Sequence, residues 1–211
     1  MMFKKLLALG PHTDDIELGA GGTLSRMLEE GTEVHVAIFS SARESLPSGL
    51  PDDTLKNECF DALKFMGISK NNILLFDYPV RKLHQYRQDV LEHLVSLRNQ
   101  VNPDCVLVPS TSDVHQDHQV LSQEGLRAFK HSTMLGYELP WNHFTFDNQA
   151  FIRLERRHVE KKNQALQYYQ SQIQKGRPYF DKEFSTSLSH VRGVQVNSNF
   201  AESFQVLRLV L

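Results

Sequence analysis

The sequence predicts an α/β protein with a mostly parallel sheet and helices on both of its faces. Up to about residue 132, short apolar segments alternate with segments in which apolar residues recur at helical spacing. Glycine and proline mark the ends of these segments, as at Gly10-Pro11 and Asn102-Pro103. Strands that alternate with helices imply right-handed crossovers, which build a largely parallel sheet.

The predicted strands are short and apolar. The first covers residues 6–9 and ends at Gly10-Pro11. In the last third of the chain the pattern changes, because two strands flank an aromatic loop that contains Trp141, Phe144 and Phe146. The remaining strands are predicted at residues 33–39, 72–76, 104–109, 134–139, 149–154 and 204–211.

The predicted helices fill the intervals between these strands. In the first helix Leu24, Met27 and Leu28 share one face, and Gly31 is suited to end it. A long polar helix is predicted at residues 157–174, before a break at residues 176–178. The other helices are predicted at residues 59–66, 90–101 and 121–129, with one more between the break and the last strand.

Composition is that of an ordinary globular chain. The 211 residues are 40% hydrophobic and 23% charged, show no repeat or linker, and are expected to form a single domain, 1–211. A net charge of −2 gives no electrostatic reason to expect nucleic acid as a partner. Cys59 and Cys105 each lie in an apolar pattern, so a disulfide and a thiolate metal site are both disfavoured.

The start of the chain carries Lys4 and Lys5 before an apolar stretch that is too short for the core of a signal peptide. No run of residues is long enough to span a bilayer. A cytoplasmic location without a membrane span is the expectation.

A dense set of metal-binding side chains follows the first strand, in Pro11-His12-Thr13-Asp14-Asp15. Ligands of open parallel sheets bind beyond the carboxyl ends of the strands, so this loop is where a site is expected. Adjacent carboxylates rarely point the same way, which favours one aspartate on a metal and the other on its water. Taken alone, the stretch also fits a simple helix N-cap at Asp14 or Asp15.

A second cluster follows the strand at residues 104–109, where His115 and His118 are three residues apart and face one way if a helix starts there. The alternative without a function is a polar loop with solvated histidines, since a chain with ten histidines can place some of them close together by chance. Two such clusters at equivalent positions of a sheet are much less expected by chance than one. Three ligands from His and Asp leave a position open for water, which is the arrangement of a catalytic metal.

The chain resembles the PIG-L/LmbE-like metal-dependent N-deacetylases, whose signature is a P-H-P-D-D motif ending in glycine and a later H-x-D-H motif. The matching stretches are PHTDDIELG at 11–19 and HQDH at 115–118. The family has a Rossmann-like sheet, so the resemblance implies an LmbE-like fold. Thr13 and Ile16 depart from the usual motif, and the departure at Ile16 leaves the role of Glu17 open.

The resemblance implies roles for six residues. It implies a zinc site formed by His12, Asp15 and His118. Asp14 is implied as the general base, and His115 as the group that stabilises the oxyanion or acts as an acid. Asp117 is implied to orient the imidazole of His115. The ligand types also suit Fe²⁺, Co²⁺ or Mn²⁺.

Weaker matches extend along the chain. Arg43 and Glu44 stand where the family often has a G-E or R-E loop, and residues 169–172, 192–195 and 201–204 look like its C-terminal elements. The stretch 137–141 looks like members associated with surface polysaccharide synthesis. Candidate substrate contacts are Arg43, Glu44, Arg81, Trp141 and Arg192. The three arginines are expected on loops, where a phosphate contact and a solvated surface arginine are both compatible with the sequence.

The expected activity is a zinc-dependent hydrolysis that removes an N-acyl group, above all N-acetyl, from an amino sugar or its conjugate. The partner is then a small amino-sugar substrate, and the resemblance is compatible with a homo-oligomer. A metal-dependent phosphohydrolase is an alternative, although such sites often use two metals and more carboxylates. A non-catalytic, metal-stabilised sugar-binding module is another, and it gives Asp14 no task. Gly19 to Gly22 lacks the spacing of a dinucleotide-binding loop, which excludes that function.

Overall fold

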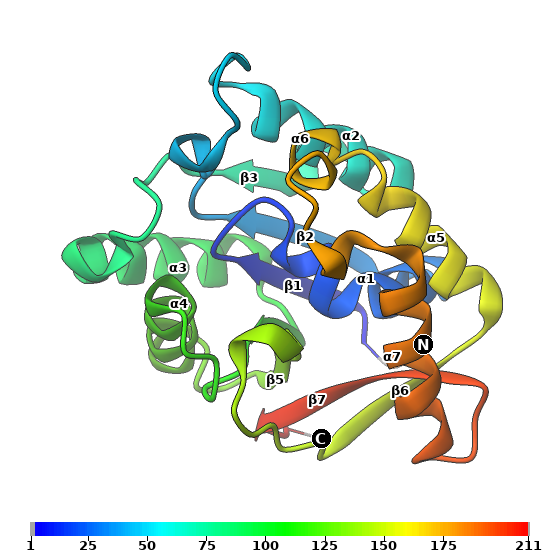
Figure 1. Cartoon of the computed structure of the whole chain (residues 1–211). Coiled ribbons are helices and arrows are strands. Elements are labelled where there is room, and N and C mark those ends of the chain that lie inside the picture. Colours follow the sequence, from blue (N-terminus) through cyan, green and yellow to red (C-terminus); the bar gives the residue numbers. More distant parts are fainter. Residues whose placement is uncertain (1–2, 211) are drawn as a thin grey trace.

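A seven-stranded sheet runs through the computed structural model, which describes residues 3–210 (Figure 1). Its spatial order is β3-β2-β1-β4-β5-β7-β6. The strands are β1 (Lys5–Gly10), β2 (Glu33–Ile38), β3 (Ile73–Leu75), β4 (Cys105–Pro109), β5 (Thr133–Tyr137), β6 (Ala150–Leu154) and β7 (Phe200–Arg208).

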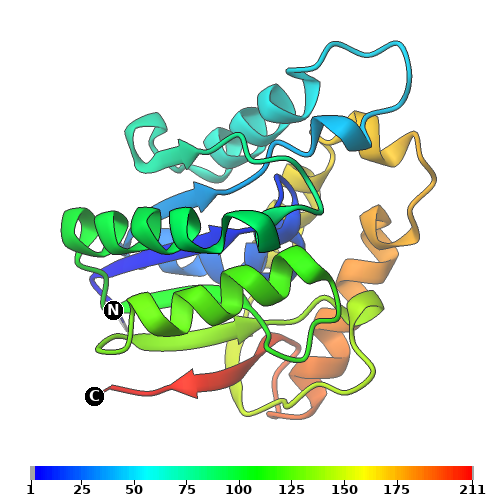
Figure 2. The same ribbon diagram turned by 90° about the vertical axis from the view of Figure 1, so that its left-hand side faces the viewer.

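The first five strands are parallel, and β7 is antiparallel to both β5 and β6. Strand order reverses beside β1, since β2 lies on one side of it and β4 on the other. A crevice forms at such a switch point, beyond the carboxyl ends of the two strands. Those ends point away from the side of the molecule on which both chain ends lie (Figure 2).

Helices cover both faces of the sheet (Figure 1). Side chains of β1 alternate, so that Leu6 and Ala8 enter one core and Leu7 and Leu9 enter the other. The helices on the side of Leu6 are α1 (Asp15–Glu29), α2 (Thr54–Met66), α5 (Arg156–Leu166) and α7 (Lys182–Val194). Those on the side of Leu7 are α3 (Arg87–Val101) and α4 (Gln116–Ala128). The predicted α/β, mostly parallel, Rossmann-like fold is confirmed.

Several predicted elements have the wrong bounds: the helices predicted at 59–66 and 121–129 each begin five residues earlier, at Thr54 and Gln116. The helix predicted at residues 157–174 ends at Leu166, and a separate short helix, α6 (Gln170–Ile173), follows. The chain leaves the helix there because Tyr169 turns into the interior, where it is fully buried. The strand predicted at 204–211 begins four residues earlier, at Phe200, and residue 211 of that prediction lies outside the described residues.

Helix α1 is kinked at Ala20, whose backbone has φ −144° and ψ 16°. The kink leaves backbone groups that side chains from elsewhere satisfy: Glu202 accepts from the N–H groups of Gly22 and Thr23, and Lys162 donates to the carbonyl of Leu18. Lys162 and Glu202 also form a buried ion pair of 2.8 Å. This pair therefore shapes the helix that begins at the candidate site. Among residues 3–210, no helix combines the length and the apolar character needed to cross a membrane.

Candidate active site

The loops after β1 and β4 meet at the carboxyl edge of the sheet because these two strands are neighbours. They border a cavity of about 290 Å³. Both predicted clusters line it, through His12, Asp14, Asp15, His115 and His118. The sequence motifs, about a hundred residues apart, thus form one site.

Three donor atoms form a nearly equilateral triangle in this cavity. His12 Nδ1 lies 3.0 Å from Asp15 Oδ2, and His118 Nε2 lies 3.3 Å from Asp15 Oδ2 and 3.3 Å from His12 Nδ1. Ligand atoms about 2.1 Å from a tetrahedral cation are about 3.4 Å from one another. The triangle and its donor types therefore fit a divalent metal. His115 also offers a ring nitrogen within 4.8 Å of nitrogens of His12 and His118.

In each of the two imidazoles, the ring nitrogen that is not part of the triangle lies close to a buried carboxylate. His118 Nδ1 lies 2.7 Å from Asp113 Oδ2, and His12 Nε2 lies 3.0 Å from Asp117 Oδ2. A ring N–H that donates to a carboxylate leaves the other nitrogen free to bind a metal. Asp113 and Asp117 thus direct His118 Nε2 and His12 Nδ1 toward the triangle.

The prediction that Asp117 orients the imidazole of His115 is wrong for its carboxylate, which contacts His12 instead. Only the backbone of Asp117 reaches His115, since its N–H donates to His115 Nδ1 over 3.2 Å. This occurs because His115 occupies the N-cap position of α4, while Asp117 lies in its first turn. The carboxylate of Asp117 also accepts from the backbone N–H groups of Arg81 and Leu83.

His115 is held as a neutral imidazole. Burial lowers its pKa to about 4, with His118 and His12 acting in the same direction. Because Nδ1 accepts from the backbone, the proton of the neutral ring lies on Nε2. His115 can therefore donate a hydrogen bond from Nε2 at neutral pH.

The pKa values of the two imidazoles in the triangle, His12 and His118, are raised, whereas that of His115 is lowered. Burial opposes their charge, but Asp15 and Asp117 outweigh it and raise the pKa of His12 to about 9. Burial is likewise outweighed at His118, where Asp15 and Asp113 raise the pKa to about 10. Asp15, despite its burial, has its pKa held well below the usual range by His118 and His12. Without a metal, protons balance the charge of this carboxylate.

The side chain of Asp14 does not cap the helix that follows it. It stands at the N-cap of α1 but makes no capping hydrogen bond, which disfavours the reading of this residue as a cap. It is 9% exposed and lines the cavity. Burial and the neighbouring Asp15 raise its pKa to about 6, against the effect of His12 and Arg177. A carboxylate of this kind is suited to accept a proton near neutral pH.

The loop that carries Asp14 is tied to the C-terminal part of the chain. The hydroxyl of Tyr169 donates to the carbonyl of Thr13, and lies 2.6 Å from Glu17 Oε1. Glu17 is fully buried, and burial raises its pKa to about 8. Tyr169 thus restrains the loop at the position where Thr13 replaces the stiffer proline of the family motif.

The predicted substrate contacts divide into two groups. Arg81 and Trp141 line the cavity, and Arg81 lies on a loop as predicted. Arg43, Glu44 and Arg192 do not line it. Arg43 and Glu44 belong to the exposed 3₁₀ helix η1 (Arg43–Ser45), where Arg43 pairs with Asp77 at 3.3 Å.

The placement of Arg192 on a loop was wrong. It lies in α7, because the helical segment that contains it continues to Val194. Its Nε donates to Glu138 Oε2 over 3.0 Å, and the two side chains form a largely buried ion pair. Arg192 therefore has a structural partner, and its contact with substrate remains only a prediction.

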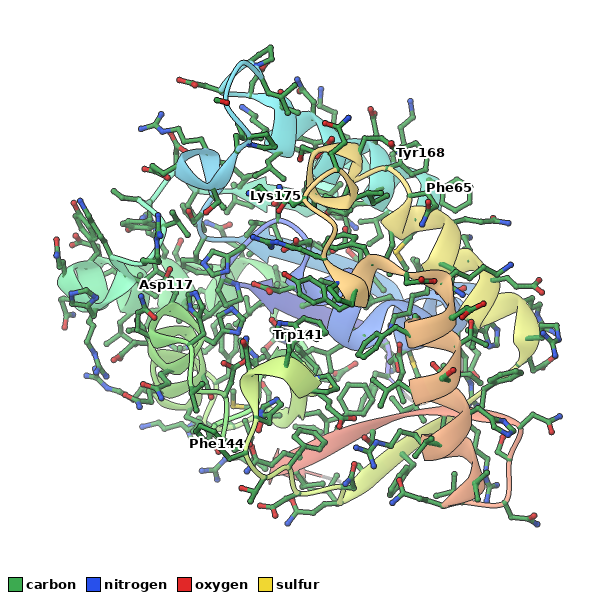
Figure 3. All side chains as sticks on the ribbon, in the orientation of Figure 1. Phe65, Asp117, Trp141, Phe144, Tyr168 and Lys175 are labelled. Atoms are coloured by element: carbon green, nitrogen blue, oxygen red, sulfur yellow. The ribbon has the colours of Figure 1, made fainter. Side chains whose placement is uncertain are left out.

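Trp141 belongs to the 3₁₀ helix η4 (Pro140–Asn142) and stacks on Tyr179, with ring centroids 4.0 Å apart and 13° between the ring planes. One face of the indole is therefore already covered. Phe144 is 94% exposed and lies on the outside of the molecule, away from Trp141 (Figure 3). It does not line the cavity.

The cavity is also lined by residues that were not predicted from the sequence, among them Asn142, Gln172, Arg177 and Tyr179. Gln172 belongs to a stretch that resembles the family, which was the one available signal. Arg177 lies in the Gly/Pro break after α6, where sequence alone indicates only a loop.

Comparison with known proteins assigns the family. The family model described as GlcNAc-PI de-N-acetylase (PIG-L) matches residues 7–129, which is more than half of the chain. The chain is 29% identical over 174 residues to the uncharacterized deacetylase YaiS of Escherichia coli K12, and this covers 80% of the chain and 91% of YaiS.

Solved structures share the fold over nearly the whole chain. The N,N'-diacetylchitobiose deacetylase of Pyrococcus horikoshii superposes with a TM-score of 0.80 at 18% identity, covering 98% of this chain and 84% of that one. The 4-carboxy-2-hydroxymuconate hydratase GalB of Pseudomonas putida KT2440 also superposes with a TM-score of 0.80, at 22% identity, covering 99% and 98%. Since both reactions occur on this fold, the assignment of a reaction comes from the family. The chain belongs to the PIG-L (GlcNAc-PI de-N-acetylase) family, and is a hydrolase of amide C–N bonds.

Proposed function

We propose that this enzyme removes an N-acyl group, N-acetyl above all, from an amino sugar or amino-sugar conjugate, with zinc held by His12, Asp15 and His118. The observation that carries the proposal is the triangle of donor atoms beside a carboxylate, Asp14, that makes no capping hydrogen bond to the helix it precedes. The family description names N-acetylglucosamine, and the Pyrococcus relative is named for an N-acetylated disaccharide.

A divalent cation held by these three residues would polarise the amide carbonyl and make water more acidic. The donor set of imidazole and carboxylate is one that zinc accepts, and Fe²⁺, Co²⁺ and Mn²⁺ accept it as well. The carboxylates of Asp113 and Asp117 keep the two imidazoles in the tautomers that leave the required nitrogens free.

Asp14 takes the proton of the attacking water while the water oxygen bonds to the carbonyl carbon. Its pKa of about 6 leaves it ionised at neutral pH, and basic enough to accept that proton. When the C–N bond breaks, the same proton passes from Asp14 to the departing nitrogen. The products are the amine and the carboxylic acid of the acyl group, and the acid then gives its remaining proton to the amine or to solvent.

His115 is placed to stabilise the negative charge that develops on the carbonyl oxygen. It lines the cavity, its ring centroid lies 4.9 Å from that of His12, and Nε2 carries its proton. A fixed hydrogen-bond donor at this position lowers the barrier because it needs no reorganisation during the reaction.

Acetate release from N-acetylated amino sugars tests the proposal. The zinc-loaded protein should release acetate and free amine, and chelator should abolish release until metal is restored. Absence of release from every sugar amide, free or conjugated, would refute it. A metal content near two ions per chain together with phosphate release would support the phosphohydrolase alternative instead.

A further inference from the structure

Two arginines line the catalytic cavity without a carboxylate partner. Arg81 lies between β3 and α3, and Arg177 lies between α6 and α7. In the hydrogen bonds and ion pairs of residues 3–210, neither guanidinium pairs with Asp or Glu. Several arginines elsewhere do, as Arg87 does with Glu124 and Arg192 with Glu138. Two arginines whose charge is not balanced by a paired carboxylate therefore border the cavity.

Arg81 is held there at a conformational cost. Its φ is 66°, in the left-handed region that non-glycine residues rarely adopt. The buried carboxylate of Asp117 accepts from the N–H of Arg81 and from that of Leu83, 3.1 Å away. Val80 and Leu83, on either side, are buried. Such over-determined strain is typical of functional sites.

Arg177 approaches the same space from the C-terminal part of the chain. Its guanidinium carbon lies 5.8 Å from the ring centroid of Tyr179, the residue on which Trp141 stacks. It is also close enough to Asp14 to act against the rise in the pKa of that carboxyl. Arg177 thus lies close to both Tyr179 and the carboxylate of Asp14.

The two carboxylates that line the cavity have proposed roles other than pairing with Arg81 or Arg177. Asp15 belongs to the donor triangle, and Asp14 is the proposed base. A guanidinium offers paired donors whose geometry matches the oxygens of a phosphate or a carboxylate. We propose that Arg81 and Arg177 form a binding site for an oxyanion carried by the substrate, so that the preferred substrate is an amino sugar bearing a phosphate or carboxylate group. This inference rests on the proposed deacetylation.

Binding can be followed without turnover. Trp141 is the only tryptophan of the chain and lines the cavity, so its fluorescence reports on ligands there. Zinc-loaded protein carrying Asp14→Asn is titrated with N-acetylglucosamine 1-phosphate, N-acetylmuramic acid, neutral N-acetylglucosamine and inorganic phosphate. We expect at least one of the two anionic sugars to bind about tenfold or more tightly than the neutral one, with an affinity that falls as salt rises.

Variants assign this preference to the two arginines. Arg81→Asn is chosen because asparagine tolerates positive φ, and Arg177→Gln removes the other guanidinium. Each should weaken binding of the anionic sugar about tenfold and leave binding of N-acetylglucosamine nearly unchanged. Arg153→Gln is the matched control, since Arg153 is exposed on β6, away from the cavity. It should change neither affinity.

Equal affinity for anionic and neutral sugars would overturn the inference, as would equal losses for both kinds of sugar in the arginine variants. Inorganic phosphate that binds as tightly as the sugar phosphate would show an adventitious ion only. These outcomes are separable from the proposed function. Acetate release from neutral sugars would persist if only the oxyanion site were wrong, and release from all sugars would fail if the deacetylation were wrong.

Discussion

Asp14 and Asp15 are adjacent in sequence and have opposite electrostatic environments. The pKa of Asp15 is held well below its usual range by His118 and His12, whereas burial and the charge of Asp15 raise that of Asp14 to about 6. Two carboxylates whose pKa values are pushed apart can take different roles in one reaction. Asp15 is suited to permanent charge and metal binding, and Asp14 to proton transfer.

Replacing Asp14 with asparagine should therefore lower kcat by about 10²–10⁴-fold, the usual contribution of a general base. The zinc content of the purified protein should not change, because Asp14 is not part of the triangle. Acetate release and elemental analysis measure the two quantities. Asp15→Asn is the contrast and should lose zinc. An Asp14→Asn protein that lost its zinc, or that kept full activity, would contradict this division of roles.

Asp117→Asn should weaken zinc binding about 10–100-fold, since its carboxylate orients His12 from behind. Competition with a chromogenic chelator measures this affinity. Asp113→Asn is a matched variant, because Asp113 supports His118 in the same way. If Asp117 acted only on His115, kcat would fall while zinc affinity stayed at the level of the unmodified protein.

At the scale of single elements, the kink in α1 depends on two buried side chains from distant segments. Lys162 of α5 and Glu202 of β7 bond the backbone groups that the kink frees, and they pair with each other at 2.8 Å. Removing one member of a buried ion pair leaves the charge of the other uncompensated, which typically lowers the free energy of unfolding by several kcal/mol.

Lys162→Met should accordingly lower the free energy of unfolding by about 3 kcal/mol. Glu202→Gln should also destabilise the protein, and the double variant should lose less than the sum of the two. Denaturant unfolding of the four proteins gives the coupling. Strictly additive losses would show that the two side chains stabilise α1 independently.

The elements of the fold whose sequence signals are local could be predicted from the sequence. Apolar runs ending at glycine or proline located β1 and β4, and parallel topology then implied that the loops carrying His12 and His118 would meet. Contacts that depend on how the elements pack could not be predicted from the sequence. That the carboxylate of Asp117 contacts His12 rather than His115 depends on how α4 docks, and α5 ends at Leu166 because Tyr169 is needed inside, although the polar pattern continues.

At the scale of the molecule, the site is built from both the N-terminal and the C-terminal parts of the chain. The proposed metal ligands lie within the part that the family model matches, whereas Trp141, Gln172 and Arg177 of the cavity lie beyond it. The last strand, β7, is inserted between β5 and β6, so the sheet is incomplete without the C-terminal segment. On the basis of this interleaving, we propose that the chain forms one domain.

A single domain should unfold in one cooperative transition. Fluorescence of Trp141 reports on the cavity, and far-ultraviolet circular dichroism reports on the helices. We expect the two probes to give coincident midpoints in denaturant, both with and without zinc. Separate midpoints would indicate that the C-terminal segment unfolds on its own.

Metal and protons should compete for the same two imidazoles, and this sets how stability depends on pH. In the metal-free protein the pKa of His12 is about 9 and that of His118 about 10, above the usual 6.5. Folding therefore takes up protons, and the stability these groups contribute is fully present below pH 6.5 and is lost as the pH rises through 9 and 10. A cation must displace those protons, so zinc binds more tightly as they become easier to remove.

The difference in Tm between zinc-loaded and chelator-treated protein should thus widen from pH 6.5 to about 9, because the loaded form gains affinity while the metal-free form loses stability. At pH 7, calorimetric titration with zinc in buffers of different ionisation enthalpy should show proton release. His118→Ala is the control, and its Tm should respond little to zinc at any pH. A Tm difference that stayed constant over this range, with no protons released, would show that His12 and His118 do not exchange protons for metal.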